Sequence, residues 1–134
     1  MSRARPILLL ALLTIILVGV LAACRGNAAE SPQFVVDEQA EITCSEECVN
    51  HGQCGTIDDD PVALAMEGGP AVSLHDRFFL EGALVTILEL SQRELLDARN
   101  GVPLPESTPF PHTFYRVSSE GKIAWVSEWC LVRP

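Results

Sequence analysis

Hydrophobic residues follow two different patterns along this chain. The first is an uninterrupted run from Ile7 to Val18, and no charged residue lies between Pro6 and Ala23. From Phe34 onward, hydrophobic residues occur in short groups separated by glycine, proline and acidic residues. Short groups of this kind, bounded by turn residues, are typical of β-strands. The sequence therefore predicts an N-terminal hydrophobic segment followed by an all-β body.

The strongest strand candidate is the segment 83–90, in which Val85 and Ile87 alternate with Thr86 and Glu89. Two shorter hydrophobic groups, 62–66 and 78–80, precede it and end at glycine-containing turns. The segments 114–118 and 123–127 form the clearest hairpin, joined by a turn at Ser119-Glu120-Gly121-Lys122.

The segment 91–112 allows two interpretations. Ser91-Gln92-Arg93-Glu94 has the form of a helix capping box. In contrast, Asn100-Gly101 is a strong hairpin turn, which would make residues 95–99 a strand. We favour the hairpin because the neighbouring segments are all predicted strands. The prolines from Pro103 to Pro111 then predict an exposed, extended loop that continues through His112.

The chain has 134 residues and a net charge of −9, which fits one small acidic domain. Without residues 1–23, the chain keeps 7 Lys/Arg against 18 Asp/Glu, because Arg3 and Arg5 are lost. This balance excludes nucleic acid as a partner, because no cationic surface would meet the phosphates. The densest acidic run, Asp58-Asp59-Asp60, is predicted to be a loop rather than a calcium site.

The first 24 residues carry a targeting signal. Arg3 and Arg5 form a short positive region before the hydrophobic run, and Leu21-Ala22-Ala23-Cys24 follows it. This arrangement resembles the lipobox of bacterial lipoproteins. The resemblance implies that residues 1–23 are a signal peptide, that the Cys24 thiol carries a diacylglycerol, and that the protein is anchored to a lipid bilayer outside the cytosol.

An uncleaved membrane anchor and plain secretion are the two alternatives to lipidation, and both keep the body extracytoplasmic. Residues 24–40 lack a hydrophobic period and are predicted to be a flexible tether, although Phe34-Val35-Val36 could begin the first strand. The β domain is predicted to cover residues 41–134.

Once Cys24 is assigned to lipid, four cysteines remain: Cys44, Cys48, Cys54 and Cys130. An even number of cysteines outside the cytosol predicts two disulfides, and three pairings are formally open. A Cys44–Cys48 pair is the least favoured, because it would enclose only three residues. One upstream cysteine is then expected to bond Cys130 and close a loop of about 80 residues.

Two other interpretations of this cysteine block remain open. The cysteines could form a metal site together with His51, although their spacing differs from the CxxC spacing of zinc sites. The run from Cys48 to Cys54 is also similar to part of an EGF-like module, but EGF-like modules have six cysteines and this body has four.

The C-terminal half resembles the bacterial SH3-like (SH3b) family. The resemblance covers roughly residues 62–133, with alanine at position 124 where the family usually has glycine. The matching positions are Val85-Thr86-Ile87-Leu88, Tyr115, Val117, Gly121, Trp125, Val126 and Leu131. It implies a small SH3-like β-barrel that binds cell-wall peptide or another envelope protein.

No catalytic, cofactor or metal site is predicted. The three histidines, His51, His75 and His112, lie in different segments, and no nucleophile, zincin or phosphate-loop motif occurs. The candidate binding residues are Tyr115, Arg116 and Trp129, whereas Trp125 is expected in the core. The alternative functions are a structural subunit of an envelope complex and an extracytoplasmic metal-binding domain.

Overall fold

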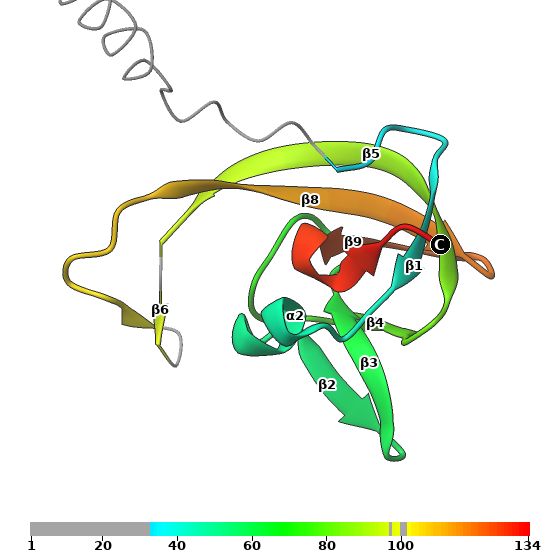
Figure 1. Cartoon of the computed structure of the whole chain (residues 1–134), viewed down its shortest axis with the longest axis horizontal. Coiled ribbons are helices and arrows are strands. Elements are labelled where there is room, and N and C mark those ends of the chain that lie inside the picture. Colours follow the sequence, from blue (N-terminus) through cyan, green and yellow to red (C-terminus); the bar gives the residue numbers. More distant parts are fainter. Residues whose placement is uncertain (1–32, 97, 100–101) are drawn as a thin grey trace, which may run out of the picture. The chain divides into compact units, whose positions relative to one another are not determined.

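The computed structural model describes residues 33–96, 98–99 and 102–134 (Figure 1). The predicted signal peptide, Cys24 and the first part of the expected tether lie outside the described residues. Pro32–Pro134 form one compact unit. Within the described ranges, none of the helices is long and apolar enough to cross a membrane.

The main sheet is antiparallel and has five strands in the order β10-β1-β5-β8-β9. The strands are β1 (Gln39–Ile42), β5 (Leu84–Leu95), β8 (Phe110–Ser119), β9 (Lys122–Ser127) and β10 (Leu131–Val132). The last strand therefore pairs with the first, and the predicted central strand 83–90 lies at the centre of the sheet. The predicted hairpin of residues 114–127 is formed by β8 and β9.

A second, three-stranded sheet contains β2 (Cys54–Ile57), β3 (Asp60–Ala65) and β4 (Arg77–Leu80). An isolated bridge between Met66 and Trp125 connects the end of β3 to β9 of the main sheet. The all-β class and the two disulfides are confirmed. Among the described residues, however, the strands form these two sheets and one two-stranded sheet, and not a closed barrel.

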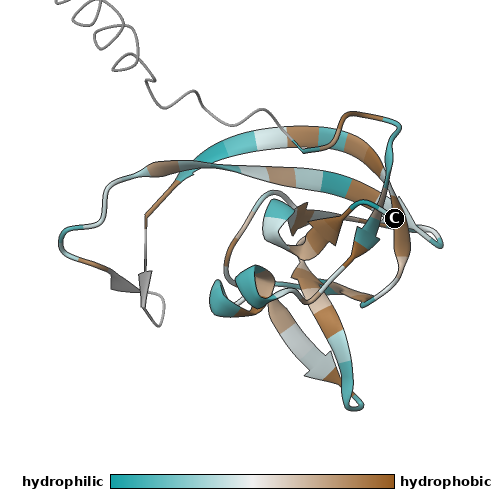
Figure 2. Ribbon diagram, viewed as in Figure 1, coloured by the Kyte–Doolittle hydropathy of each residue, from teal (hydrophilic) through white to brown (hydrophobic). Residues whose placement is uncertain are grey.

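The core lies between these sheets and is filled by side chains from almost every strand. Phe34, Ile42, Ile87, Tyr115 and Val117 are each fully buried in it. Along β5, hydrophobic residues occupy the half near the core, whereas the far half is mostly hydrophilic (Figure 2). From Gln92 onward, β5 pairs only with the start of β8, so the two strands continue past the other strands as a two-stranded ribbon (Figure 1). The β5 residues of this ribbon are mostly exposed, whereas His112 and Thr113 of β8 are buried.

Two tight hairpin turns contain pairs of residues with positive φ. Asp58 and Asp59 have φ of 51° and 69° between β2 and β3, and Glu120 and Gly121 have φ of 49° and 80° between β8 and β9. Two positive φ values in a two-residue loop correspond to a type I′ turn, which matches the twist of the flanking strands. The prediction that the acidic run forms a loop is confirmed for Asp58 and Asp59, whereas Asp60 begins β3.

In the segment 91–112, the capping-box interpretation is wrong because β5 continues as a strand through Leu95. Two short paired strands follow, β6 (Ala98–Arg99) and β7 (Val102–Pro103), as a hairpin at Asn100-Gly101 requires, although these two residues lie outside the described ones. The proline-rich loop ends earlier than expected, since β8 begins at Phe110. Pro111 is tolerated there because this part of β8 pairs only with β5 and lies at the edge of the sheet.

The folded body begins before the expected boundary at residue 41. Phe34 is fully buried, its ring meets Tyr115 edge to face with 5.6 Å between centroids, and its backbone N–H donates to the Tyr115 hydroxyl at 3.1 Å. Arg133 contacts this segment through Glu38 and through the Gln33 carbonyl. Residues 33–40 therefore belong to the folded body through the buried Phe34 and Ala40, although Val35, Val36 and Asp37 are exposed.

Candidate functional site

The four cysteines of the body are joined as Cys44–Cys54 and Cys48–Cys130, with Cα–Cα distances of 5.7 and 5.0 Å. The expectation of two disulfides is confirmed, and so is the expected bond to Cys130, which connects residues 82 positions apart. The sequence left the partner of Cys130 open, because it does not reveal which cysteine faces the core. In the structure, Cys48 is the cysteine that faces the core, and it is fully buried.

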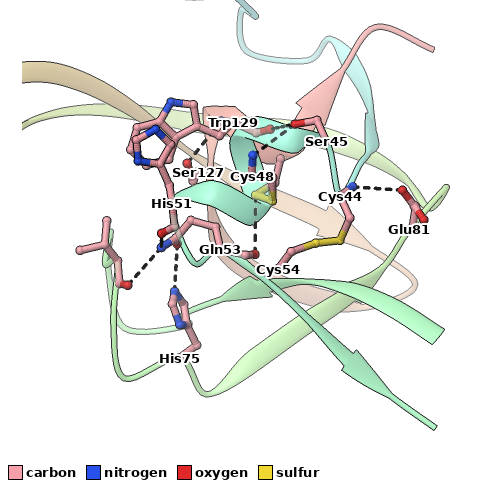
Figure 3. The surroundings of a disulfide bond; sticks show 12 residues. Cys44, Ser45, Cys48, His51, Gln53, Cys54, His75, Glu81, Ser127 and Trp129 are labelled. Carbon is pink, nitrogen blue, oxygen red and sulfur yellow. Dashed lines mark hydrogen bonds between the residues drawn. A yellow bond between two sulfur atoms is a disulfide. The ribbon is translucent and has the colours of Figure 1, made fainter. Parts of the chain in front are cut away.

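A short helix that the sequence analysis did not predict places Cys48 in this position. The helix α2 (Glu46–Asn50) has Ser45 as its N-cap, whose hydroxyl accepts from the Cys48 N–H at 3.3 Å. The same hydroxyl donates to the Trp129 carbonyl in the 3₁₀ helix η1 (Glu128–Cys130) at 2.9 Å. Ser45 and the Cys48–Cys130 bond thus hold α2 against η1 (Figure 3).

Three rings stack where α2, η1 and the start of β8 meet. The His51 ring lies 3.6 Å from Trp129 at an interplanar angle of 6°, and the His112 ring lies 3.7 Å from Trp129 at 26°. His112 is buried, Trp129 is partly exposed and His51 is exposed, so the stack leads from the interior to the surface. Phe110 lies beside it, 6.3 Å from Trp129. Figure 3 shows His51 reaching Trp129 from α2.

Burial determines the charge of the inner ring. Desolvation, together with repulsion from His51, lowers the pKa of His112 to about 4, so its imidazole is neutral at pH 7. Its Nε2 lies 2.8 Å from the Ser127 hydroxyl, which also accepts from the Trp129 N–H as the N-cap of η1. Ser127 is 1% exposed. This His–Ser pair is therefore a structural contact and not an accessible nucleophile with its base.

The third histidine belongs to a neighbouring polar cluster. The buried Gln53 side chain donates from Nε2 to the backbone carbonyls of His51 and Val72, at 3.0 and 3.1 Å. Its Oε1 is therefore the atom that meets His75 Nε2, at 3.1 Å, and the imidazole must donate this bond. Burial lowers the pKa of His75. Through the Gln53 bond to its carbonyl, the cluster fixes the backbone of His51, which directly follows α2.

The three candidate binding residues lie in different environments. Tyr115 is fully buried, and burial raises the pKa of its hydroxyl, so it cannot contact a ligand. Arg116 is partly exposed and lies 3.7 Å from Glu89 across the sheet, in register with Trp125. Trp129 is partly exposed, but imidazoles stack on its ring. Trp125 was expected in the core, but it is partly exposed and does not belong to the buried core cluster.

His51 and His112 are the residues of this site that sequence reasoning missed. They are 61 positions apart. The Cys48–Cys130 bond, the Ser45 hydrogen bond to Trp129 and the contact between His112 and Ser127 bring them to the same tryptophan. The one local signal was the position of His51 and Trp129, since each lies close in sequence to a cysteine of that bond. Comparisons with protein-family models, with curated proteins and with solved structures found no match.

Proposed function

We propose that this chain is a lipid-anchored binding protein of the bacterial cell envelope, attached to the membrane through Cys24. The observation that carries the proposal is the cysteine pairing. All four cysteines after Cys24 form disulfides, as expected in an oxidising compartment. Cys24 is then the one cysteine of the five without a disulfide partner in the body. A cysteine directly after Leu21-Ala22-Ala23 is the residue that the lipoprotein family acylates.

We also propose that the body is SH3-like. The strand order β10-β1-β5-β8-β9, with a 3₁₀ turn before the last strand, supports a relation to the SH3 arrangement. Of the positions that carry the resemblance, Tyr115, Val117, Val126 and Leu131 are buried, and Gly121 has a φ of 80° in a turn. These residues therefore support the fold. They do not indicate a ligand.

The proposed ligand is a cell-wall peptide or its glycan, and the proposed contact surface is the outer end of the ring stack. His51 is exposed at the outer end of the stack, and Trp129 beneath it is partly exposed next to Phe110. Exposed rings with polar edges suit peptides and sugars. This assignment refines the earlier set of candidates. It keeps Trp129, adds His51 and removes Tyr115.

Sedimentation of the full-length, detergent-solubilised protein with purified peptidoglycan tests the ligand. We expect the wild type to co-sediment, and His51→Ala and Trp129→Ala to raise the dissociation constant at least about tenfold, equivalent to roughly 1.4 kcal/mol. Glu120→Ala is the matched control, because Glu120 is exposed in the turn at the opposite end of β8. It should bind like the wild type.

The second candidate function is a subunit of an envelope complex, which is favoured by the two-stranded ribbon that continues past the other strands. If the wild-type protein does not sediment with peptidoglycan, the wall-binding proposal is wrong and a protein partner is favoured. Site-specific crosslinking from Gln92, exposed on this ribbon, would then identify the partner.

A further inference from the structure

The two disulfides lie next to each other and differ in accessibility. Cys48 and Cys130 are fully buried, whereas Cys44 and Cys54 are partly exposed. The Sγ atoms of Cys44, Cys48 and Cys54 all lie within 4.8 Å of one another. An external thiol therefore reaches only the outer bond, but a thiol released from that bond is already close to the inner one (Figure 3).

We propose that Cys44–Cys54 is a thiol–disulfide exchange site for an external dithiol, and that the exchange continues inward to Cys48–Cys130. The proposal concerns a reaction of the body and does not depend on the ligand or on lipidation. The dithiol is the reductant, and the two disulfides are the groups that become reduced.

The first step opens the outer bond. A thiolate of the dithiol attacks one sulfur of Cys44–Cys54 and forms a mixed disulfide, and the other cysteine leaves as a thiolate that takes up a proton. The second thiol of the reagent then displaces the protein. Two electrons have moved, so the reagent is now a disulfide, and Cys44 and Cys54 are thiols.

The second step opens the inner bond without direct access to it. A thiolate at Cys44 or Cys54 attacks Cys48 Sγ, a bond to Cys48 forms, and Cys130 leaves as a thiolate that is then protonated. A second dithiol reduces the new outer bond, which leaves four thiols and two oxidised reagent molecules. This step removes the covalent bond between α2 and η1 and leaves the Ser45 hydrogen bond. Because Cys130 directly follows Trp129, it loosens the ring stack.

The experiment uses the full chain with Cys24→Ala, so that only thiols of the body are scored. The protein is treated with dithiothreitol, quenched in acid, alkylated and mapped by mass spectrometry. We expect Cys44 and Cys54 to be labelled first and Cys130 later, with a transient disulfide between Cys48 and either Cys44 or Cys54. Labelling of Cys130 before the outer pair, or without this transient disulfide, would overturn the proposal.

A Cys44→Ser/Cys54→Ser double variant provides the comparison. We expect its Cys48–Cys130 bond to be reduced at least about tenfold more slowly than in the wild type, because the internal attacking thiols are gone. A rate equal to or faster than that of the wild type contradicts the proposal if the variant keeps its near-UV circular dichroism. If the variant unfolds, the order of labelling in the chain with all four cysteines decides.

Discussion

Tyr115 shows how a single side chain can be important without touching a ligand. Its ring fills the core, and its hydroxyl accepts from the N–H of Phe34, a fully buried residue 81 positions away. A buried backbone N–H without an acceptor is costly, so this hydroxyl fixes the point at which the N-terminal segment enters the body. The aromatic residue that resembled a binding residue in the sequence is therefore a structural one.

Tyr115→Phe tests this role directly. The substitution keeps the ring packed against Phe34 but removes the acceptor, and we expect it to lower the free energy of unfolding by about 1–2 kcal/mol. Urea denaturation followed by circular dichroism measures the change. Arg116→Lys, at the neighbouring and partly exposed position, should stay within about 0.5 kcal/mol of the wild type. A loss below 0.5 kcal/mol in Tyr115→Phe would contradict the role of the hydroxyl.

His112 predicts a dependence of stability on pH. The pKa of His112 is about 4 in the folded protein and 6.5 in the unfolded chain. Between these two pH values, the unfolded chain therefore binds a proton at His112 that the folded chain does not. The contribution of His112 to stability is therefore complete above pH 6.5 and is lost as the pH falls toward 4. The loss amounts to roughly 3 kcal/mol.

Urea titrations between pH 7.5 and 4, compared with His112→Gln, measure this loss. The variant lacks the titrating ring, so its stability should fall less steeply over that interval. The carboxylates titrate in both proteins, and the difference between the two curves isolates the histidine. Parallel curves for the wild type and His112→Gln would show that the ring does not hold a lowered pKa.

At the scale of elements, the two disulfides stabilise the body unequally. Cys48–Cys130 joins residues 82 positions apart, and Cys44–Cys54 joins residues only 10 apart. The chain-entropy model gives about 4.5 kcal/mol for the longer loop and about 2.7 kcal/mol for the shorter one. The Cys48–Cys130 bond also holds α2 against η1. Both the loop entropy and the contacts between α2 and η1 therefore make it the more stabilising of the two disulfides.

We therefore expect Cys48→Ala/Cys130→Ala to lower the free energy of unfolding by about 2 kcal/mol more than Cys44→Ala/Cys54→Ala does. Each double variant removes one bond and leaves the other intact, so each serves as the control for the other. Guanidinium denaturation monitored by tryptophan fluorescence provides the comparison. An equal loss in both variants, or a greater loss for the short loop, would disprove the ranking.

The elements also show what a sequence can predict. The strand 83–90, the hairpin of residues 114–127 and the involvement of Cys130 in a disulfide follow from alternation, turn chemistry and cysteine number, which are local or countable signals. Helix α2 was missed because five residues between two cysteines have no detectable hydrophobic period. The favoured interpretation of the segment after Ser91 was a hairpin, and the alternative capping-box helix is wrong because pairing with β8 outweighs a local preference for helix.

The candidate site was less predictable than the strands. The ring stack depends on contacts between His51, His112 and Trp129, and these residues come from three separate segments. Only tertiary packing brings them together, and no spacing in the sequence records it. Trp129 was expected near the surface and is partly exposed, but the rings that stack on it were not foreseen.

At the scale of the whole molecule, an acidic body follows the sequence Leu21-Ala22-Ala23-Cys24. The body packs its first described residues against its last ones through Arg133, and a buried disulfide connects α2 to the C-terminal turn. We propose that this compact body is presented to the cell wall by a lipid at Cys24. The proposed lipidation of Cys24 and the two disulfides support each other, because both would require export.

The most direct test of this account is the intact mass of the native protein purified from the membrane fraction. We predict a chain that begins at Cys24, carries a diacylglycerol on that cysteine, and is lighter than the fully reduced body by four hydrogen atoms because of its two disulfides. A chain that retains residues 1–23, or one that begins at Cys24 without lipid, would contradict the account.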